Sequence, residues 1–523
     1  MQERKMAGKI QLNKRQKDIL FYLSLVMISV YVFLLAGEKG YILFDDSHTY
    51  IEDWFTEGVM PIYPLFIHLN LFLFGENIFL MAIVVEQAIL ATICVTIFSA
   101  TIKKRFSLSY VESYIVFAFT FLPFTIELPT AMITHMILTE GIAYALFYIF
   151  VIIMLKAVWY RSWKWLAGGW FMALLLSLIR SQLLLLFGVW GVIVLYVAML
   201  GKRKKAILFL VALACCMILG SVGVFSNIGV NSTYQKTVKK IEAKTGESEW
   251  EEDSQKKETD EQGENKKDKE DGQTSAVSVS QYASLFFSRG MYEADYADYL
   301  LFEEGEMREL FLRLYDAADQ EKCRYEYAQG GLWAWKDIAG GIGKVGKVGF
   351  NEQKQFYLEV KPEIFGNTEQ YQLLSNHNYT IIGITLLKHH FGRFMYHTLQ
   401  MLPQAFICTV FFQIAPVYLL CHLITLFLYI SAIALMIWAF ADSKVDRAYA
   451  EFMAFILGTN LVMVILISMI FFGQQRYLFY TFGMFYIAYF LLVVQLWKKY
   501  GVRMWKAIRH RVGEKCRKEA VNG

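Results

Sequence analysis

Ten stretches of this chain are apolar over lengths near those of a membrane-crossing helix. A helix needs roughly 20 apolar residues to cross the ~30 Å hydrocarbon core of a bilayer. The stretches are residues 18–36, 77–100, 110–128, 132–155, 166–181, 183–200, 206–226, 411–440, 451–472 and 479–497. Of the 523 residues, 56% are hydrophobic and 19% charged, against about 45–50% and about 25% in soluble proteins. The sequence therefore predicts an α-helical polytopic membrane protein whose partner is the lipid bilayer.

Every second predicted loop is basic. Lysine and arginine precede the first span and follow the second, fourth, sixth, eighth and tenth, as in 103–105 and 202–205. The positive-inside rule places such loops, and here both termini, on the cytoplasmic side of the plasma membrane. The alternation requires two spans within 166–200, broken at Arg180, instead of one long tilted helix. The first span is longer than a signal-peptide core and no A-x-A site follows it, which favours an anchor.

The domain organisation follows from the loops between the spans. We expect an N-terminal membrane module (1–226) with an outer loop (37–76), an extracytoplasmic domain (227–402), C-terminal membrane helices (403–497) and a basic cytoplasmic tail (498–523).

The extracytoplasmic domain is expected to be mixed but mainly helical, with a helical pattern at 307–314. Residues 236–275 are almost free of apolar side chains, so we expect disorder there. Residues 339–349 indicate a glycine-rich turn, and 381–399 an amphipathic helix at the membrane surface.

The most informative polar segment lies just after the first span. Asp45 and Asp46 are adjacent, and Tyr50 follows four residues after Asp46. A carboxylate at the outer mouth of a membrane domain is suited to accept a proton from an attacking hydroxyl, because partial desolvation raises its pKa toward the useful range. The alternative is a solvated loop without chemistry.

Further motifs follow in a fixed order. Tyr63-Pro64 and a Phe-Gly pair lie between the acidic pair and the second span, Leu138-Thr139-Glu140 opens the fourth span, and Leu178-Ile179-Arg180 lies within 166–200. Gln475-Arg476-Tyr477 lies near the outer end of the ninth span. Together with the acidic pair, this pattern resembles the GT-C superfamily of membrane glycosyltransferases, and within it the bacterial relatives of dolichyl-phosphate-mannose protein mannosyltransferases. The resemblance covers 18–200 well and 400–497 loosely.

The resemblance implies a GT-C-like bundle of about ten membrane helices. It implies transfer of a sugar, with inversion, from a polyprenyl-phosphate carrier to an extracytoplasmic acceptor. The essential acidic residue falls at Asp45 or Asp46, as a general base or as the ligand of a divalent cation such as Mg²⁺ or Mn²⁺. Asp46 is favoured because its spacing to Tyr50 matches D-x-x-x-Y. Residues expected to contact substrate are Tyr50, Tyr63, His135, Glu140, Arg180, Arg476 and Tyr477.

The donor phosphate needs a cation, and the Tyr-Pro segment lacks the basic residue that many relatives carry there. Arg476 is suited to a bidentate phosphate contact, although an arginine at a helix end also snorkels to the lipid headgroups. Arg180 lies in an apolar stretch, where a charge suggests a role, unless the chain breaks there and the side chain meets the interface. Glu140 is either a substrate contact or a helix-start residue stabilised by the dipole.

Other classes of function fit less well. The basic runs are short and flank spans, which argues against nucleic-acid binding. No CxxC or HExxH spacing is present, so a protein-held zinc or iron–sulfur site is not expected. His389, His390 and Arg393 are suited to contact the acceptor or lipid headgroups, but the wet face of the expected surface helix fits them better. A polyprenyl-linked glycan polymerase or ligase is the first alternative, and a lipid or solute transporter is the second, although the paired broken helices of transporters are not evident.

Overall fold

The computed structural model describes residues 13–37, 40–52, 60–126, 132–200, 281–331, 334–366, 368–411, 418–470 and 475–501. The expected span 206–226, the expected disordered segment 236–275 and the tail from 502 on lie outside the described residues. The chain divides into two compact units. We call the first, with described residues up to 200 and from 395 on, the membrane unit, and the second, residues 281–394, the insert unit.

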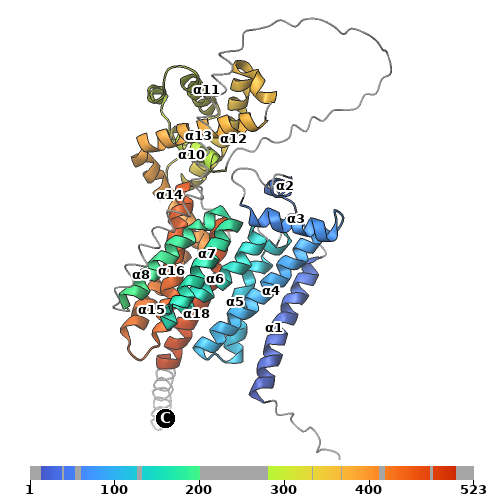
Figure 1. Ribbon diagram of the computed structural model, residues 1–523. Helices are drawn as coiled ribbons and strands as arrows, with labels where there is room; N and C mark the ends of the chain where they lie inside the picture. Colours follow the sequence, from blue (N-terminus) through green and yellow to red (C-terminus); the bar gives the residue numbers. More distant parts are fainter. Residues whose placement is uncertain are drawn as a thin grey trace, which may run out of the picture. The chain divides into compact units, whose positions relative to one another are not determined.

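The membrane unit is a bundle of α-helices (Figure 1). Its helices are α1 (Lys14–Ala36), α2 (Asp45–Glu52), α3 (Ile62–Phe74), α4 (Phe79–Phe106), α5 (Tyr110–Thr125), α6 (Glu140–Tyr160), α7 (Trp163–Ile179), α8 (Leu186–Leu200), α15 (Tyr418–Ala441), α16 (Arg447–Ile470), α17 (Gln475–Leu478) and α18 (Phe482–Leu496). Helix α14 (Phe391–Val410) begins at the end of the insert unit. Short 3₁₀ helices are η2 (Ile133–His135), η3 (Ser181–Leu185) and η8 (Phe479–Thr481), and a π-helical turn η9 (Trp497–Gly501) follows α18.

Seven helical segments among the described residues are long and apolar enough to cross a membrane. They correspond to α1, α4, α6, η3 with α8, α15, α16, and the run from η8 to η9. Three shorter apolar helices accompany them, namely α3, α5 and α7. The helical, membrane-embedded class expected from the sequence is confirmed, whereas the count of ten spans stays a prediction.

Two expected spans differ in detail from the helices. The segment 132–139, which we expected to begin the fourth span, forms η2 and a parallel β-bridge between Ile42 and Met136, so that α6 begins only at Glu140. The stretch 166–200 is broken as the alternation of basic loops required. Helix α7 ends at Ile179, Arg180 is extended (φ −148°, ψ 119°), and η3 follows.

Helix α6 is the central helix of the membrane unit. It packs against α4, α7, α8 and α16, and 78% of its most apolar 18-residue window is buried. By contrast, 22% of the corresponding window of α1 is buried, which is typical of a helix that faces lipid. The buried Tyr148 of α6 donates a hydrogen bond to the Thr120 carbonyl of α5 (3.1 Å).

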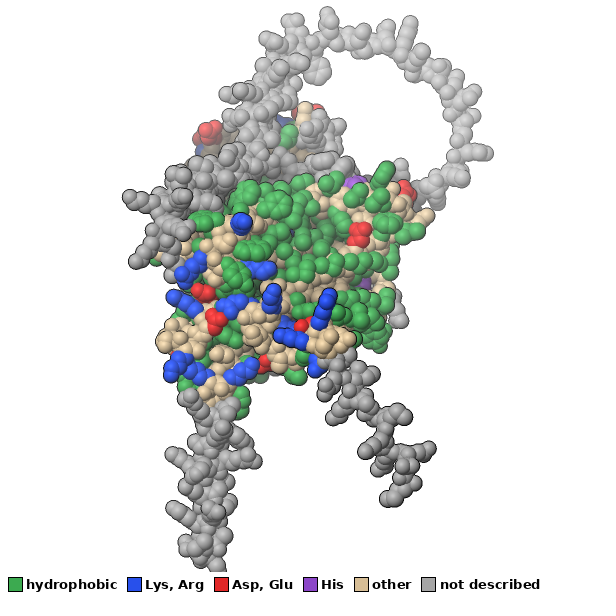
Figure 2. Space-filling model, turned by 60° about the horizontal axis from the view of Figure 1, so that its bottom comes forward, with side chains coloured by type: hydrophobic (Ala, Val, Ile, Leu, Met, Phe, Trp, Pro, Cys, Tyr) green, Lys and Arg blue, Asp and Glu red, His purple; other side chains and the backbone are tan. Residues whose placement is uncertain are grey.

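One end of the membrane unit is basic. Figure 2 shows lysine and arginine side chains gathered on this face, next to a broad apolar surface. Ion pairs join its helix ends: Lys103 of α4 with Asp18 of α1 (2.5 Å), Arg105 with Asp446 (2.7 Å), and Lys498 with Glu112 of α5 (2.7 Å). The described beginning and end of the chain thus lie at the same end of the bundle.

The insert unit is also helical within the described residues. It contains α10 (Gln281–Tyr292), η4 (Tyr296–Leu301), α11 (Glu306–Gln320), η5 (Tyr325–Tyr327), α12 (Ala334–Val360), η6 (Pro362–Gly366) and α13 (Thr368–His389). Helix α10 packs against α12 and α13. Gly290 and Gly383 let α10 and α13 approach closely, because a Cβ at Gly290 would lie 2.5 Å from the Gly383 carbonyl oxygen.

Two expectations for the insert unit are wrong and one is confirmed. Residues 339–349 form no turn but lie inside α12, where Gly341 and Gly349 give room to Tyr292 and Phe287 of α10. Residues 381–399 form no single helix, because His390 interrupts it between α13 and α14. The helix expected at 307–314 is present as α11.

Candidate active site

Helix α2, which begins with the acidic pair, is fastened to the segment that leads into α6. The Ile42 backbone accepts a hydrogen bond from Ile137 N–H (3.1 Å) and donates one to the His135 carbonyl (3.0 Å). The Ser47 hydroxyl donates to the Ile137 carbonyl (2.8 Å) and accepts from Phe44 N–H (2.9 Å). These bonds hold the first turn of α2 beside the segment 132–139.

Asp46 and Tyr50 lie on this anchored helix. The Asp46 side chain is partly exposed, whereas that of Asp45 lies outside the described side chains. Burial raises the pKa of Tyr50 well above its ordinary value, and the nearby Glu140 carboxylate raises it further, against the opposing effect of Arg180. Tyr50 is therefore a neutral phenol at physiological pH, and it is suited to hydrogen bonding but not to accepting a proton.

Gln87 of α4 holds the same segment from the other side. Its amide nitrogen donates to the carbonyls of Thr134 and Met136 (3.1 Å each), and its amide oxygen accepts from the Tyr63 hydroxyl (3.4 Å). The Tyr63 ring lies edge-on to that of Tyr50, with centroids 5.4 Å apart. Gly141 is required beside this amide, since a Cβ there would lie 1.9 Å from the Gln87 side-chain oxygen.

Glu140 and Arg180 form a buried ion pair, with 4% and 12% of their side chains exposed. Arg180 reaches Glu140 because α7 ends one residue earlier and the chain is extended at Arg180. Thr139 joins both side chains: its hydroxyl accepts from Arg180 Nη1 (3.0 Å) and donates to Glu140 Oε2 (3.1 Å). Removing one partner of such a pair costs about 3–5 kcal/mol, because the other charge is left buried.

Aromatic side chains lie next to this ion pair. The Arg180 guanidinium lies over the Tyr477 ring, 5.0 Å from its centroid. Tyr480, which follows on η8, stacks on Tyr144 of α6 with centroids 4.0 Å apart. The backbone of Arg476 belongs to α17 next to Tyr477, but its side chain lies outside the described side chains.

The structure thus brings together most residues that the sequence singled out, from five separate segments of the membrane unit. We call this set the tyrosine–arginine cluster: Tyr50, Tyr63, Thr139, Glu140, Tyr144, Arg180, Tyr477 and Tyr480. Tyr144, Tyr480 and the supporting Gln87 were missed by the sequence analysis. Gln87 gave a signal, since it is a polar residue within an apolar span, whereas buried tyrosines in an aromatic-rich chain gave none.

Other sequence candidates have different surroundings. His135 is 2% exposed, and its backbone carbonyl anchors the chain at Ile42, so a contact of its ring with substrate stays a prediction. Among the described residues, Asp46 belongs to no group of three metal-ligating side chains. The one such group found there is Asp298, His389 and His390 of the insert unit.

The cluster lies at the end of α6 opposite the basic face. Helix α6 has 21 residues, so Glu140 lies roughly 30 Å along the axis from the Arg161 end. Glu140 and Arg180 compensate each other, and the partly exposed Asp46 lies close enough to Tyr50 to act on it electrostatically. Such an arrangement suits a general base next to a hydroxyl-binding surface.

No known protein family, no curated protein sequence and no solved structure matches this chain.

Proposed function

We propose that this chain is a membrane glycosyltransferase that moves a sugar from a polyprenyl-phosphate carrier to an acceptor hydroxyl outside the cytoplasm. The observation that carries the proposal is the convergence of Tyr50, Glu140, Arg180 and Tyr477 at one end of the membrane unit. These residues come from motifs far apart in the sequence, and the helix that starts with Asp45 and Asp46 is fastened next to them.

In the proposed reaction, Asp46 accepts the proton of the acceptor hydroxyl. The acceptor oxygen attacks C1 of the sugar, the new C1–O bond forms, and the bond from C1 to the phosphate oxygen breaks. The polyprenyl phosphate leaves with the electron pair, and the configuration at C1 is inverted by this single displacement. A preorganised cation stabilises the charge that develops on the leaving phosphate.

Arg476 is the proposed cation at the lipid phosphate. Its backbone lies one residue before Tyr477, whose ring contacts Arg180, so it belongs to the same end of the unit. Arg180 itself is compensated by Glu140, and in the proposal this pair positions Tyr477 and the segment before α6. The partly exposed phenols of Tyr50 and Tyr477 offer hydrogen bonds to sugar hydroxyls.

The test is transfer from polyprenyl-phosphate sugars by the purified protein, with Asp46→Asn, Asp45→Asn and the control Asp18→Asn at the basic end. The proposal expects turnover to fall by about 10²–10⁴-fold in Asp46→Asn, as for loss of a general base, with donor binding retained. If turnover falls only in Asp45→Asn, Asp45 is the general base instead of Asp46. Undiminished turnover in both variants would refute the mechanism.

A further inference from the structure

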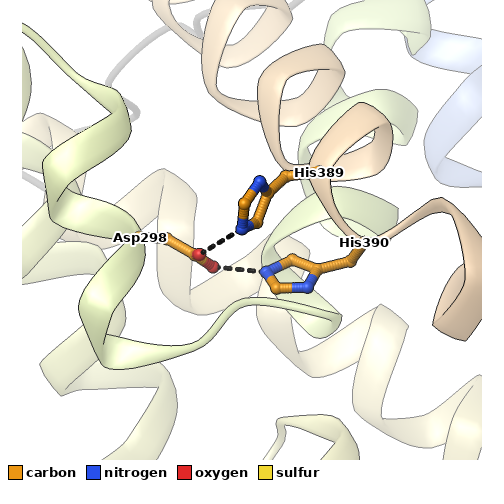
Figure 3. Close-up of side chains that lie close together, drawn as sticks. All are labelled: Asp298, His389 and His390. Carbon is orange, nitrogen blue, oxygen red and sulfur yellow. Dashed lines mark hydrogen bonds and ion pairs between the residues drawn. The ribbon is translucent and has the colours of Figure 1, made fainter.

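We propose that Asp298, His389 and His390 of the insert unit form a binding site for a transition-metal dication of the zinc type. Figure 3 shows both imidazoles directed at the two oxygens of one carboxylate. The inference does not depend on the proposed sugar transfer, since none of the three residues belongs to the tyrosine–arginine cluster.

The local fold turns two consecutive histidines toward one point. In an unbroken helix, neighbouring residues do not face each other. Here α13 ends at His389 and α14 begins at Phe391, and the rings of His389 and His390 lie edge to face with centroids 4.8 Å apart.

The carboxylate is held in place before any ion arrives. Asp298 lies in η4, and its Oδ2 accepts a hydrogen bond from the backbone N–H of Asp295 (2.7 Å) as half of a capping box. The Asp298 side chain is 4% exposed. Burial and the cap fix the direction of its oxygens, as a metal site requires of its ligands.

The distances between the ligand atoms lie on both sides of those expected around a small tetrahedral ion. Ligand atoms about 2.0–2.2 Å from zinc lie roughly 3.3–3.6 Å apart. Asp298 Oδ1 is 3.7 Å from His389 Nε2, Oδ2 is 2.6 Å from His390 Nε2, and the three ligand atoms lie within 4.8 Å of one another. A hydrogen bond explains the short contact to His390, but 3.7 Å exceeds hydrogen-bond range. Shared coordination accounts for both histidines.

The charge of Arg393, three residues after His390, is compensated by a carboxylate. Both of its terminal nitrogens donate to the Asp295 carboxylate (3.1 and 3.0 Å). Tyr325 also donates to Asp295 (2.7 Å). Because Arg393 is compensated in this way, the Asp298 carboxylate supplies the local negative charge. His389 is 53% exposed, which gives an ion a path from solvent and leaves room for water as a fourth ligand.

The ligand types select the class of ion. Two imidazoles and one carboxylate suit zinc and neighbouring first-row dications, whereas Mg²⁺ and Ca²⁺ prefer oxygen ligands. An ion here would fasten η4 to the junction of α13 and α14, and it would stabilise the insert unit by mass action.

The experiment is a Zn²⁺ titration of the full-length, detergent-solubilised protein after chelator treatment, in competition with a chromophoric chelator. Co²⁺ absorption reports the coordination geometry, and Mg²⁺ and Ca²⁺ serve as further probes. We expect one Zn²⁺ per chain, a tetrahedral Co²⁺ spectrum and no competition by Mg²⁺ or Ca²⁺. We expect His389→Ala and Asp298→Asn to weaken Zn²⁺ binding more than about 100-fold, beyond the effect of losing a supporting hydrogen bond.

His377→Ala is the matched control, because His377 lies on the same helix, twelve residues before His389 and so roughly 18 Å along its axis. It should bind Zn²⁺ like the wild type. His389→Ala is the decisive variant, since a half-exposed side chain is dispensable for folding. The proposal would be overturned if His389→Ala bound Zn²⁺ as tightly as the wild type. It would also be overturned if His389→Ala and His377→Ala lost the same amount of Zn²⁺ affinity.

Discussion

At the scale of single residues, the ion pair between Glu140 and Arg180 joins the start of α6 to the residue that follows α7. Both side chains are buried, and Thr139 bonds to each of them. Removing one of the two charges leaves the other buried without its partner, which lowers the free energy of unfolding strongly. Removing both charges lowers it less.

We expect Glu140→Gln and Arg180→Gln each to destabilise the protein by about 3–5 kcal/mol, and the double variant to lose less than the sum. The control is Glu359→Gln, which removes an exposed pair with Arg313 (2.6 Å) and should cost about 0–1 kcal/mol. Thermal unfolding in detergent measures all four variants. If the stability lost in the double variant equalled the sum of the losses in the two single variants, Glu140 and Arg180 would not be coupled.

Asp442 at the basic end gives a pH prediction. Lys499, the Lys444 backbone N–H and Tyr500 lower the pKa of its carboxyl from 3.8 to about 2. A carboxyl whose pKa is lower in the folded state stabilises the fold above its unfolded pKa, and this contribution is lost as the pH falls through the folded pKa.

The difference in unfolding temperature between wild type and Asp442→Asn should therefore be constant above about pH 4. It should shrink between pH 3.8 and about 2. A pH series of thermal melts checks this. A difference that stays the same down to pH 2 would show that the ionised carboxylate contributes nothing.

At the scale of the elements, glycines that looked like turn residues are packing residues. A Cβ at Gly383 of α13 would lie 2.3 Å from the Phe286 backbone carbon of α10, whereas one at Gly343 of α12 would meet nothing within 4 Å. Since backbone atoms cannot give way as a flexible side chain does, the close approach depends on Gly383.

We expect Gly383→Ala to destabilise the protein by about 1–3 kcal/mol through overpacking. Gly343→Ala, at an exposed helix position, should stabilise it by roughly 0.5–1 kcal/mol. Chemical denaturation followed by helical circular dichroism compares the two. Equal effects of the two substitutions would mean that α10 and α13 do not pack this closely.

The sequence predicted elements better than it predicted their contacts. Apolar length revealed the membrane helices, and the alternation of basic loops required a break within 166–200, which was expected at Arg180-Ser181-Gln182. The sequence-based prediction was wrong at 339–349, because glycine favours turns locally but also allows close packing of helices. The prediction of one helix over 381–399 was wrong at His390, because an interruption at one residue does not change the hydrophobic pattern. The partners of Glu140 and Asp298 come from distant segments, which periodicity does not reveal.

At the scale of the whole molecule, the two ends of the membrane unit differ in character. One carries the lysines and arginines, and the other carries the tyrosine–arginine cluster and α2. The positive-inside rule assigns the basic end to the cytoplasm.

Cysteine labelling tests this orientation. In intact cells, a membrane-impermeant maleimide should react with His48→Cys on α2, and with Lys104→Cys or Lys444→Cys only after permeabilisation. All three positions are exposed, and Cys94, Cys323, Cys408 and Cys421 are buried. Labelling of Lys104→Cys in intact cells would invert the topology and remove the outer location of the proposed site.

The proposed function requires a polyprenyl-phosphate sugar as the donor. The most direct measurement presents the purified wild-type protein with a polyprenyl-phosphate sugar, a polyprenyl-diphosphate glycan and a nucleotide sugar, and follows the released carrier and the anomeric configuration of the product. We predict release of polyprenyl phosphate in step with transfer, and an inverted product. Consumption of the diphosphate-linked glycan alone would indicate a polymerase or ligase, and no consumption of any donor would contradict the enzymatic account.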